Sequence, residues 1–318
     1  MASESTETWR QQVERIRNDW ERTRDSSNLF PPAGKPILDM DNVLGEKPFM
    51  ILWYEDGPDS DSEQCVRLYD IPGSLSGDIL RMRRNLPEIK APEPIEDHFD
   101  NIGDLLECLP LLHTDPAKHF VERGKYQSEI ENLLKCQGGA CPGKPKSGNL
   151  TRLLGKSPEG KLAFEKLLTC QSALHGIPSL ATIQRWLLDL IAALSCLHSL
   201  GIIHRDLRLD NCLFSRDGGK RLVLCDLEGR WGQRSPPEIA KEGEADEAGW
   251  SVKSDVYCIA DCIKGMVYCN APPNSYVEWT VPAPLDAVVE ACTQESPDDR
   301  PTLDELRSMV ASLTETAV

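Results

Sequence analysis

Apolar residues recur with helical spacing in several parts of the chain. The stripe within residues 6–24 consists of Trp9, Val13, Ile16 and Trp20. It predicts an amphipathic helix that packs on its own domain, with docking to a protein partner as the alternative. The run "LATIQRWLLDLIAALSCLHSLG" predicts a long buried helix that Gly201 closes. The segment "AKHFVERGKYQSEIENLLKC" predicts a further helix over residues 117–136.

Shorter runs rich in β-branched and aromatic residues predict strands. Phe49–Tyr54 and Gln64–Ile71 flank a region of Gly, Pro and Asp, which predicts a hairpin with a long loop. "NLTRLLG" and "KLAFEKLL" predict two short strands around the turn "KSPEG". Residues 72–104 are charged and contain prolines, which is typical of an exposed insertion.

Composition narrows the class of protein. The 318 residues, 40% of them hydrophobic, suffice for one large or two modest domains with a core. The net charge of −16 repels phosphate backbones, so no nucleic-acid partner is expected. The sequence shows neither a long uninterrupted apolar run nor an apolar leader, so we expect no membrane span and a cytoplasmic or nuclear protein. Its 12 cysteines are expected to be reduced, and no zinc site is expected at Cys136 and Cys141.

The segment that carries chemistry is "HRDLRLDN", followed further on by "LVLCDLEGR". Asp206 and Asn211 lie five positions apart, and Asp226 comes twenty positions after Asp206, at the end of an apolar run. One carboxylate can accept a hydroxyl proton. The amide and the other carboxylate are hard oxygen ligands that suit Mg²⁺. This ordered set indicates Mg-ATP chemistry.

The chain resembles a eukaryotic-type protein kinase domain, because "HRDLRLDN" matches the catalytic loop H-R-D-L-x-x-x-N at every fixed position. The resemblance implies that Asp206 is the catalytic base, Asn211 a magnesium ligand and Asp226 the D-F-G carboxylate that bridges Mg²⁺ to the phosphates of ATP. Arg208 stands where most serine/threonine kinases place a Lys that contacts the γ-phosphate, and it keeps the positive charge with a different geometry.

Later motifs extend the resemblance and imply structural roles. "PPE" resembles the A-P-E element, and "SPDDRPTLDEL" resembles the late motif whose Arg, here Arg300, pairs with the A-P-E Glu, here Glu238. "SDVYCIADCI" resembles the segment whose Asp, here Asp255, anchors the catalytic loop that holds His204 and Arg205.

The resemblance also implies a nucleotide site in the N-terminal half. "KLAFEKLL" resembles the strand that leads into the hinge, with Phe164 as gatekeeper and Glu165 to Leu167 meeting the adenine. "YQSEIENLL" resembles the αC helix, with Glu129 as its ion-pairing Glu. A solvated helix charge is the alternative for Glu129.

The strand Lys that should pair with Glu129 has no clear counterpart. Arg67 stands where V-A-I-K would place it, and an exposed strand arginine is an equally good interpretation. Lys118 and Lys125 are rivals by charge, although both fall within the predicted helix 117–136.

Two further departures from the family concern phosphate binding. No G-x-G-x-x-G precedes Phe49, so the backbone lacks the usual close approach to the phosphates. The D-F-G element reads "DLE", and Glu228 in place of Gly either repels phosphate or assists a metal. The activation segment is also short, with Ser235 as the one hydroxyl in "LEGRWGQRSPP", so we expect no control by phosphorylation there.

The resemblance implies an α+β, bilobal kinase-like fold with a small β-containing N-lobe and a mainly helical C-lobe. Residues 1–36 would form the N-terminal helix and linker, 37–167 the N-lobe with the insertion at about 72–104, and 168–318 the C-lobe. The implied function is transfer of the γ-phosphoryl of ATP, with Mg²⁺, to a hydroxyl of a protein Ser/Thr or of a small molecule. The alternative is a pseudokinase that binds partners without turnover.

Overall fold

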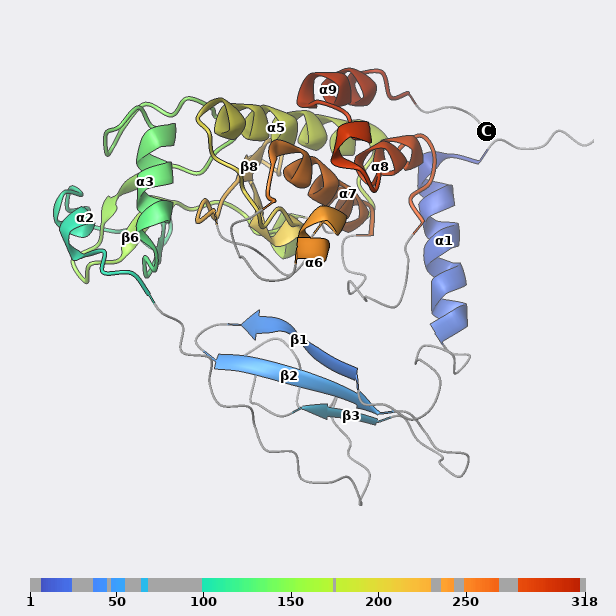
Figure 1. The fold of residues 1–318 in the computed structure, drawn as a ribbon, viewed down its shortest axis with the longest axis horizontal. Coiled ribbons are helices and arrows are strands. Elements are labelled where there is room, and N and C mark those ends of the chain that lie inside the picture. The colour runs from blue at the N-terminus through green and yellow to red at the C-terminus, as the bar shows by residue number, and fades with distance from the viewer. Residues whose placement is uncertain are drawn as a thin grey trace, which may run out of the picture. The chain divides into compact units, whose positions relative to one another are not determined.

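A computed structural model describes residues 7–24, 37–44, 47–54, 64–67, 99–173, 176–229, 236–242, 249–268 and 280–314 (Figure 1). The chain divides into two compact units, one of residues 19–98 and the other of residues 1–18 together with 99–318. Each unit is described by itself. The boundaries drawn from the sequence after residues 36 and 167 stay predictions.

The unit of residues 19–98 contains a three-stranded antiparallel sheet. Its strands are β1 (Ile37–Leu44), β2 (Lys47–Tyr54) and β3 (Gln64–Arg67), in the order β1-β2-β3. The predicted hairpin between β2 and β3 is confirmed, with Ile51 opposite Arg67. Residues 68–98, which hold the end of the predicted second strand and most of the predicted insertion, lie outside the described residues.

A second three-stranded sheet lies in the larger unit, in the order β4-β6-β5. The two strands predicted around "KSPEG" are confirmed as β5 (Leu153–Lys156) and β6 (Leu162–Glu165). The helix predicted over residues 117–136 is wrong in its first half. Residues His119–Glu122 form strand β4, which pairs with β6, and the helix α3 spans only Gln127–Cys136.

The sequence explains why His119–Glu122 forms a strand and not a helix once its partner strand is known. The run "HFVE" alternates in exposure along β4, as a strand with one face covered does. Gly124 then ends the strand; a Cβ atom there would lie within 2.9 Å of the Ile102 side chain. The short helix α2 (Gly103–Glu107) precedes this sheet.

Long helices build the rest of the unit around one apolar core. The predicted long helix is confirmed as α5 (Leu180–Ser199), which Ser179 caps by accepting a hydrogen bond from the backbone N–H of Thr182. Around it lie α7 (Val252–Tyr268), α8 (Asp286–Cys292) and α9 (Leu303–Ala311), with short helices α4 (Cys170–Ala173) and α6 (Pro237–Glu242) (Figure 1). The length and composition of α5 would also suit a membrane span, but its apolar side chains are buried in this core.

A small hairpin positions the site. Strands β7 (Cys212–Phe214) and β8 (Leu222–Leu224) pair with each other. Leu168 forms a bridge to Phe214, and Leu150 forms a bridge to Leu224. The segments that leave β6 and enter β5 are therefore tied to the hairpin that carries the loop of residues 204–211.

The N-terminal helix α1 (Trp9–Arg24) confirms the helix predicted within residues 6–24. Trp9 and Val13 are buried, and the indole Nε1 of Trp9 donates a hydrogen bond to the carbonyl of Pro178, at 3.1 Å. The first turns of the helix therefore pack on the chain's own domain. Beyond residue 16 the side chains lie outside the described part.

Candidate functional site

A buried carboxylate holds the loop "HRDLRLDN" from behind. Asp255, on α7, is fully buried and accepts hydrogen bonds from the backbone N–H groups of His204 (2.9 Å) and Arg205 (3.0 Å). The same carboxylate contacts Nε2 of His198 at 2.8 Å. Arg205 has a φ of 69°, a conformation that non-glycine residues keep only where the surroundings enforce it. The hydrogen bonds to Asp255 hold Arg205 in this conformation.

Asp206, Asn211 and Asp226 come together in front of this anchor. The amide Nδ2 of Asn211 donates to the carbonyl of Asp206 (2.8 Å) and to its Oδ2 (3.0 Å). Asp226 follows β8 with a φ of 60°. Burial raises the pKa of Asp226, and the Asp206 carboxylate adds to this, although His204 opposes it. The three residues that the sequence singled out are thus neighbours.

Asn211 and Asp226 suit Mg²⁺ chemically, since both offer oxygen ligands and Asn211 already turns its amide nitrogen away toward Asp206. Within the described part of the chain, no group of three or more His, Cys, Asp or Glu side chains is placed to hold a metal ion. A bound magnesium would therefore need further oxygens from a nucleotide or from water. Arg208 lies against Asp210, with Nη2 to Oδ2 at 2.6 Å.

The strand that leads into α3 brings a residue that the sequence analysis missed. In kinases this strand carries the Lys that binds phosphates and pairs with the αC Glu. Here the strand next to the hinge strand β6 is β4, and its last residue is Glu122. Arg67 instead ends β3, in the sheet of the other unit, and its side chain lies outside the described part. Its pairing with Glu129 stays a prediction.

Glu122 and Glu129 place two acids where kinases place an acid and a base. Burial raises the pKa of Glu129 to about 8, and the carboxyl groups of Glu122, Glu228 and Asp226 add to the shift. Partial burial, and then the charge of Asp226, raise the pKa of Glu122 to about 7, although part of this side chain stays in contact with water. Lys125 opposes both shifts. Lys118 instead is exposed and paired with Asp115.

Two side chains of α3 fasten the "DLE" segment. Ser128 Oγ donates to the carbonyl of Glu228 at 2.6 Å, and Asn132 Nδ2 donates to the carbonyl of Leu227 at 2.8 Å. Leu227 is buried, in the apolar role predicted for it. These bonds bring Glu228 close to Glu129, so its carboxylate adds negative charge to the site.

The predicted hinge follows β6. Phe164 is buried and lies opposite Phe120 of β4, and Glu165 lies opposite His119. Leu167 precedes the bridge that Leu168 forms with the β7–β8 hairpin. Adenine contacts by Glu165 and Leu167 stay a prediction. Phe120 is half-exposed, and sequence analysis gave no reason to single it out, because it assigned that segment to a helix.

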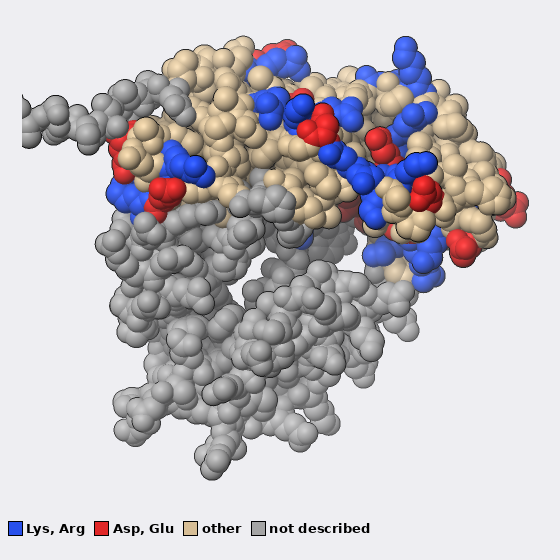
Figure 2. Space-filling model, turned by 180° about the vertical axis from the view of Figure 1, so that it is seen from behind, with Lys and Arg blue, Asp and Glu red and all other residues tan. Residues whose placement is uncertain are grey.

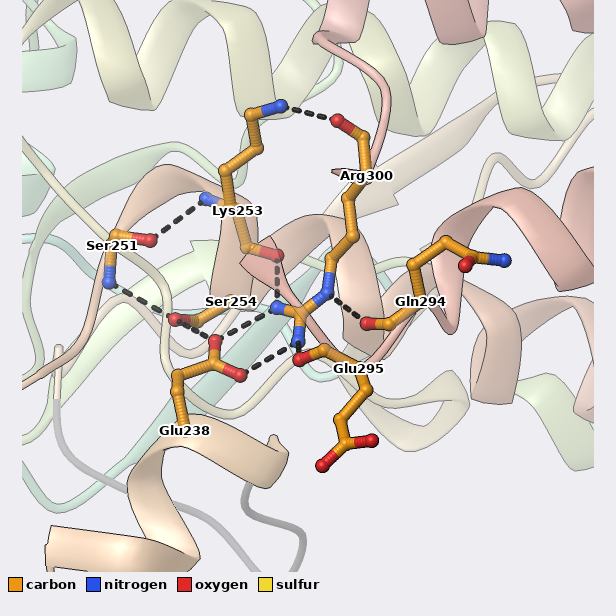
Figure 3. Close-up of polar contacts among 7 residues, drawn as sticks. All are labelled: Glu238, Ser251, Lys253, Ser254, Gln294, Glu295 and Arg300. Atoms are coloured by element: carbon orange, nitrogen blue, oxygen red, sulfur yellow. Dashed lines mark hydrogen bonds and ion pairs between the residues drawn. The ribbon is translucent and has the colours of Figure 1, made fainter. Parts of the chain in front are cut away.

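Arg300 and Glu238 form a buried ion pair away from these acids (Figure 3). Nη1 and Nη2 of Arg300 donate to the two carboxylate oxygens of Glu238 at 2.8 and 2.7 Å. Arg300 also donates to the backbone carbonyls of Gln294, Lys253 and Glu295. Ser254 Oγ donates to Glu238 at 2.9 Å. This network joins α6 to α7 and to the segment before α9.

On the side of the larger unit seen in Figure 2, Lys and Arg side chains lie interspersed with Asp and Glu side chains, although the chain has a net charge of −16. Exposed lysines lie at the end of α3 and in the following loop, at Lys135, Lys144 and Lys146.

Comparison with known proteins gives two sequence relatives whose names include kinase or pseudokinase. No protein-family model matches the chain. Bradyzoite pseudokinase 1 of Toxoplasma gondii is 29% identical over 141 residues, covering 37% of this chain and 37% of that protein. The serine/threonine-protein kinase/endoribonuclease IRE1 of Oryza sativa subsp. japonica is 28% identical over 123 residues, covering 31% of this chain and 13% of that protein. The chain thus matches well under half the length of either relative.

Among solved structures, the kinase domain of Mycobacterium tuberculosis PknI aligns with a TM-score of 0.42 and 16% identity, over 56% of this chain and 74% of that one. The anchored loop, the order of the motifs and the two sequence relatives support a divergent protein kinase-like domain of α+β fold, which the sequence predicted.

Proposed function

We propose that this protein is a pseudokinase, a kinase-like module that binds partners without transferring a phosphoryl group. The observation that carries the proposal is Glu122 at the end of β4, beside the buried Glu129. A kinase needs a cation at this strand position, because it attracts the phosphates of ATP and neutralises the αC Glu. Here both positions are acidic.

The electrostatic consequence is the loss of an attraction for any bound triphosphate. A cation about 4 Å from a unit negative charge contributes about 4 kcal/mol of attraction at an effective dielectric constant of 20, and a carboxyl group with a pKa of about 7 supplies none of it. The ionised fraction of Glu122 repels phosphate, although water screens this repulsion because the side chain keeps contact with solvent. Glu228 adds a further carboxylate on the same side of α3. The name of the Toxoplasma relative, a pseudokinase, agrees with the proposal.

A second candidate is an active phosphotransferase, and the arrangement of three residues favours it. Asp206 would accept the proton of the attacking hydroxyl, and Asn211 and Asp226 would hold the magnesium that accompanies ATP. Asp206 and Asn211 already share a hydrogen bond of 3.0 Å. The acceptor would be a protein Ser or Thr, or a small-molecule hydroxyl. The name of the rice relative, a serine/threonine-protein kinase/endoribonuclease, agrees with this second candidate.

Thermal shift with ATP and Mg²⁺ separates the two candidates at the level of binding. Wild-type protein should show no rise in melting temperature with saturating ATP and Mg²⁺. Glu122→Lys should show a rise, because it restores a cation next to Glu129. Glu122→Gln is the matched control that removes the negative charge without adding a positive one, and it should show a smaller rise. A wild-type rise that Glu122→Lys fails to increase would contradict the proposal.

A further inference from the structure

Helix α3 is capped at its start by a residue from an earlier part of the chain. The first N–H groups of a helix have no partner inside it, and a side chain at the N-cap position normally accepts a hydrogen bond from one of them. The N-cap residue of α3, Tyr126, supplies no such side-chain acceptor. Instead Oδ2 of Asp100, 27 positions before Gln127, accepts a hydrogen bond from the backbone N–H of Gln127 at 2.9 Å.

Asp100 belongs to a short segment that is hydrogen-bonded to the start of α3 at further points. The backbone N–H of Asp100 donates to the carbonyl of Lys125 at 3.0 Å. Nε2 of Gln127 donates to the carbonyl of Asn101 at 2.9 Å. We call residues 99–102 the clasp. It holds the residues on both sides of the position where α3 begins.

Side-chain packing holds the clasp at both of its ends. At one end the ring centre of Phe99 lies 6.2 Å from that of Tyr126, and the guanidinium of Arg123 lies 5.1 Å from the Phe99 ring centre. At the other end Ile102 packs against Gly124, where a Cβ atom would lie 2.9 Å from the Ile102 side chain. Phe99 is also the first residue of the larger unit after the smaller unit ends. The clasp is therefore the point where the chain re-enters the larger unit.

The turn that the clasp caps also holds the "DLE" segment. Ser128 lies in this first turn, and its Oγ donates to the carbonyl of Glu228. Asn132, which donates to the carbonyl of Leu227, lies one turn further along the helix. Both hydrogen bonds between Gln127 and the clasp are exposed to water, where such bonds contribute little individually. The first turn can therefore open locally without unfolding of the domain, and Ser128 then leaves Glu228.

We propose that the clasp is a conformational control point for the candidate site. When Asp100 caps α3, Ser128 holds the "DLE" segment, and when the cap opens this hold is lost. The segment begins with Asp226, so the control acts on a residue of the site itself. The inference goes beyond the proposed function, because it applies to a pseudokinase and to a phosphotransferase alike.

Hydrogen–deuterium exchange of the full chain tests this control. Asp100→Ala should speed amide exchange about fivefold at the start of α3 and around Leu227, since this is the factor that a typical N-cap supplies. Asp100→Asn keeps an acceptor oxygen at the cap and should retain most of the protection. Asp104→Ala is the matched control, because it removes an exposed acid of the neighbouring helix α2 and leaves the cap in place. It should change exchange in neither region.

A double variant separates control through Ser128 from general loosening. Once Ser128 is replaced by Ala, adding Asp100→Ala should not speed exchange around Leu227 any further. Equal additional speeding in both backgrounds, or unchanged exchange around Leu227 in Asp100→Ala alone, overturns the inference. If Asp100→Ala also speeds exchange in α9, the comparison of the two backgrounds still decides, because only coupling through Ser128 makes the change non-additive. The measurement needs no nucleotide, so its outcome is independent of ATP binding.

Discussion

Replacing Glu238 by Gln should destabilise the protein strongly, because it takes the charged partner from a fully buried cation. The side chain of Arg300 is 0% exposed, and its guanidinium donates to both oxygens of Glu238. Breaking a buried pair by removing one partner typically costs about 3–5 kcal/mol. Glu238 is 16% exposed, and Arg300 keeps three bonds to backbone carbonyls, so the lower end, about 3 kcal/mol, is expected.

Urea unfolding at 25 °C, followed by tryptophan fluorescence, measures this loss. A domain has roughly 5–15 kcal/mol of stability, so the transition midpoint should fall clearly. The control is Glu14→Gln, which breaks the exposed pair between Arg10 and Glu14 and should cost less than about 0.5 kcal/mol. If both variants lose the same small amount, the buried pair does not stabilise the protein as argued.

The ion pair of Glu238 and Arg300 also predicts how the stability of the protein changes with pH. Burial disfavours the charged form of Glu238, but hydrogen bonds from Arg300 and Ser254 outweigh it and lower the pKa below 4.5. A group whose pKa is lowered by folding stabilises fully above its unfolded pKa, and the stabilisation is lost as pH falls through the folded value. The advantage of wild-type protein over Glu238→Gln should therefore shrink below about pH 4.5.

The remaining predictions concern α3. Because folding raises the pKa of Glu129 from 4.5 to about 8, the stability of the wild-type protein should fall as pH rises through this window. Glu129→Gln should remove that part of the decline. The variant should therefore have a higher melting temperature than wild type at pH 9 but not at pH 4. Ser128→Ala combined with Asn132→Ala should lower the free energy of unfolding by about 1 kcal/mol per lost hydrogen bond and speed amide exchange around Leu227. Amide exchange in α9 should not change. Unchanged exchange around Leu227 would show that these hydrogen bonds do not hold the segment.

Local pattern predicted the elements whose signals are long or repeated. The apolar period of α5 runs over twenty residues, and the β5–β6 hairpin is short-range, so neither depended on distant contacts. The loop residues Asp206 and Asn211 were found because their spacing matches a motif. The contacts of Asp255 and of the pair Arg300 and Glu238 lie where motif order placed them.

Tertiary pairing decided what the sequence could not. His119–Glu122 is too short for its alternation to be told from a helix turn, and its strand state depends on β6, about forty residues later. Because the strand was missed, Glu122 was not recognised at the position of the kinase Lys, and Arg67, Lys118 and Lys125 were the candidates instead. The bonds from Ser128 and Asn132 to "DLE" also join residues that are far apart in sequence.

Radiolabelled phosphoryl transfer tests the central claim most directly. Wild-type protein and Asp206→Asn are incubated with γ-labelled ATP, Mg²⁺ and a mixture of protein and small-molecule hydroxyl acceptors. Loss of a positioned general base typically lowers a rate by about 10²–10⁴-fold. The pseudokinase proposal predicts that the two proteins transfer label at the same background level. Transfer by the wild type that exceeds the variant by about a hundredfold or more would contradict it and establish the phosphotransferase instead.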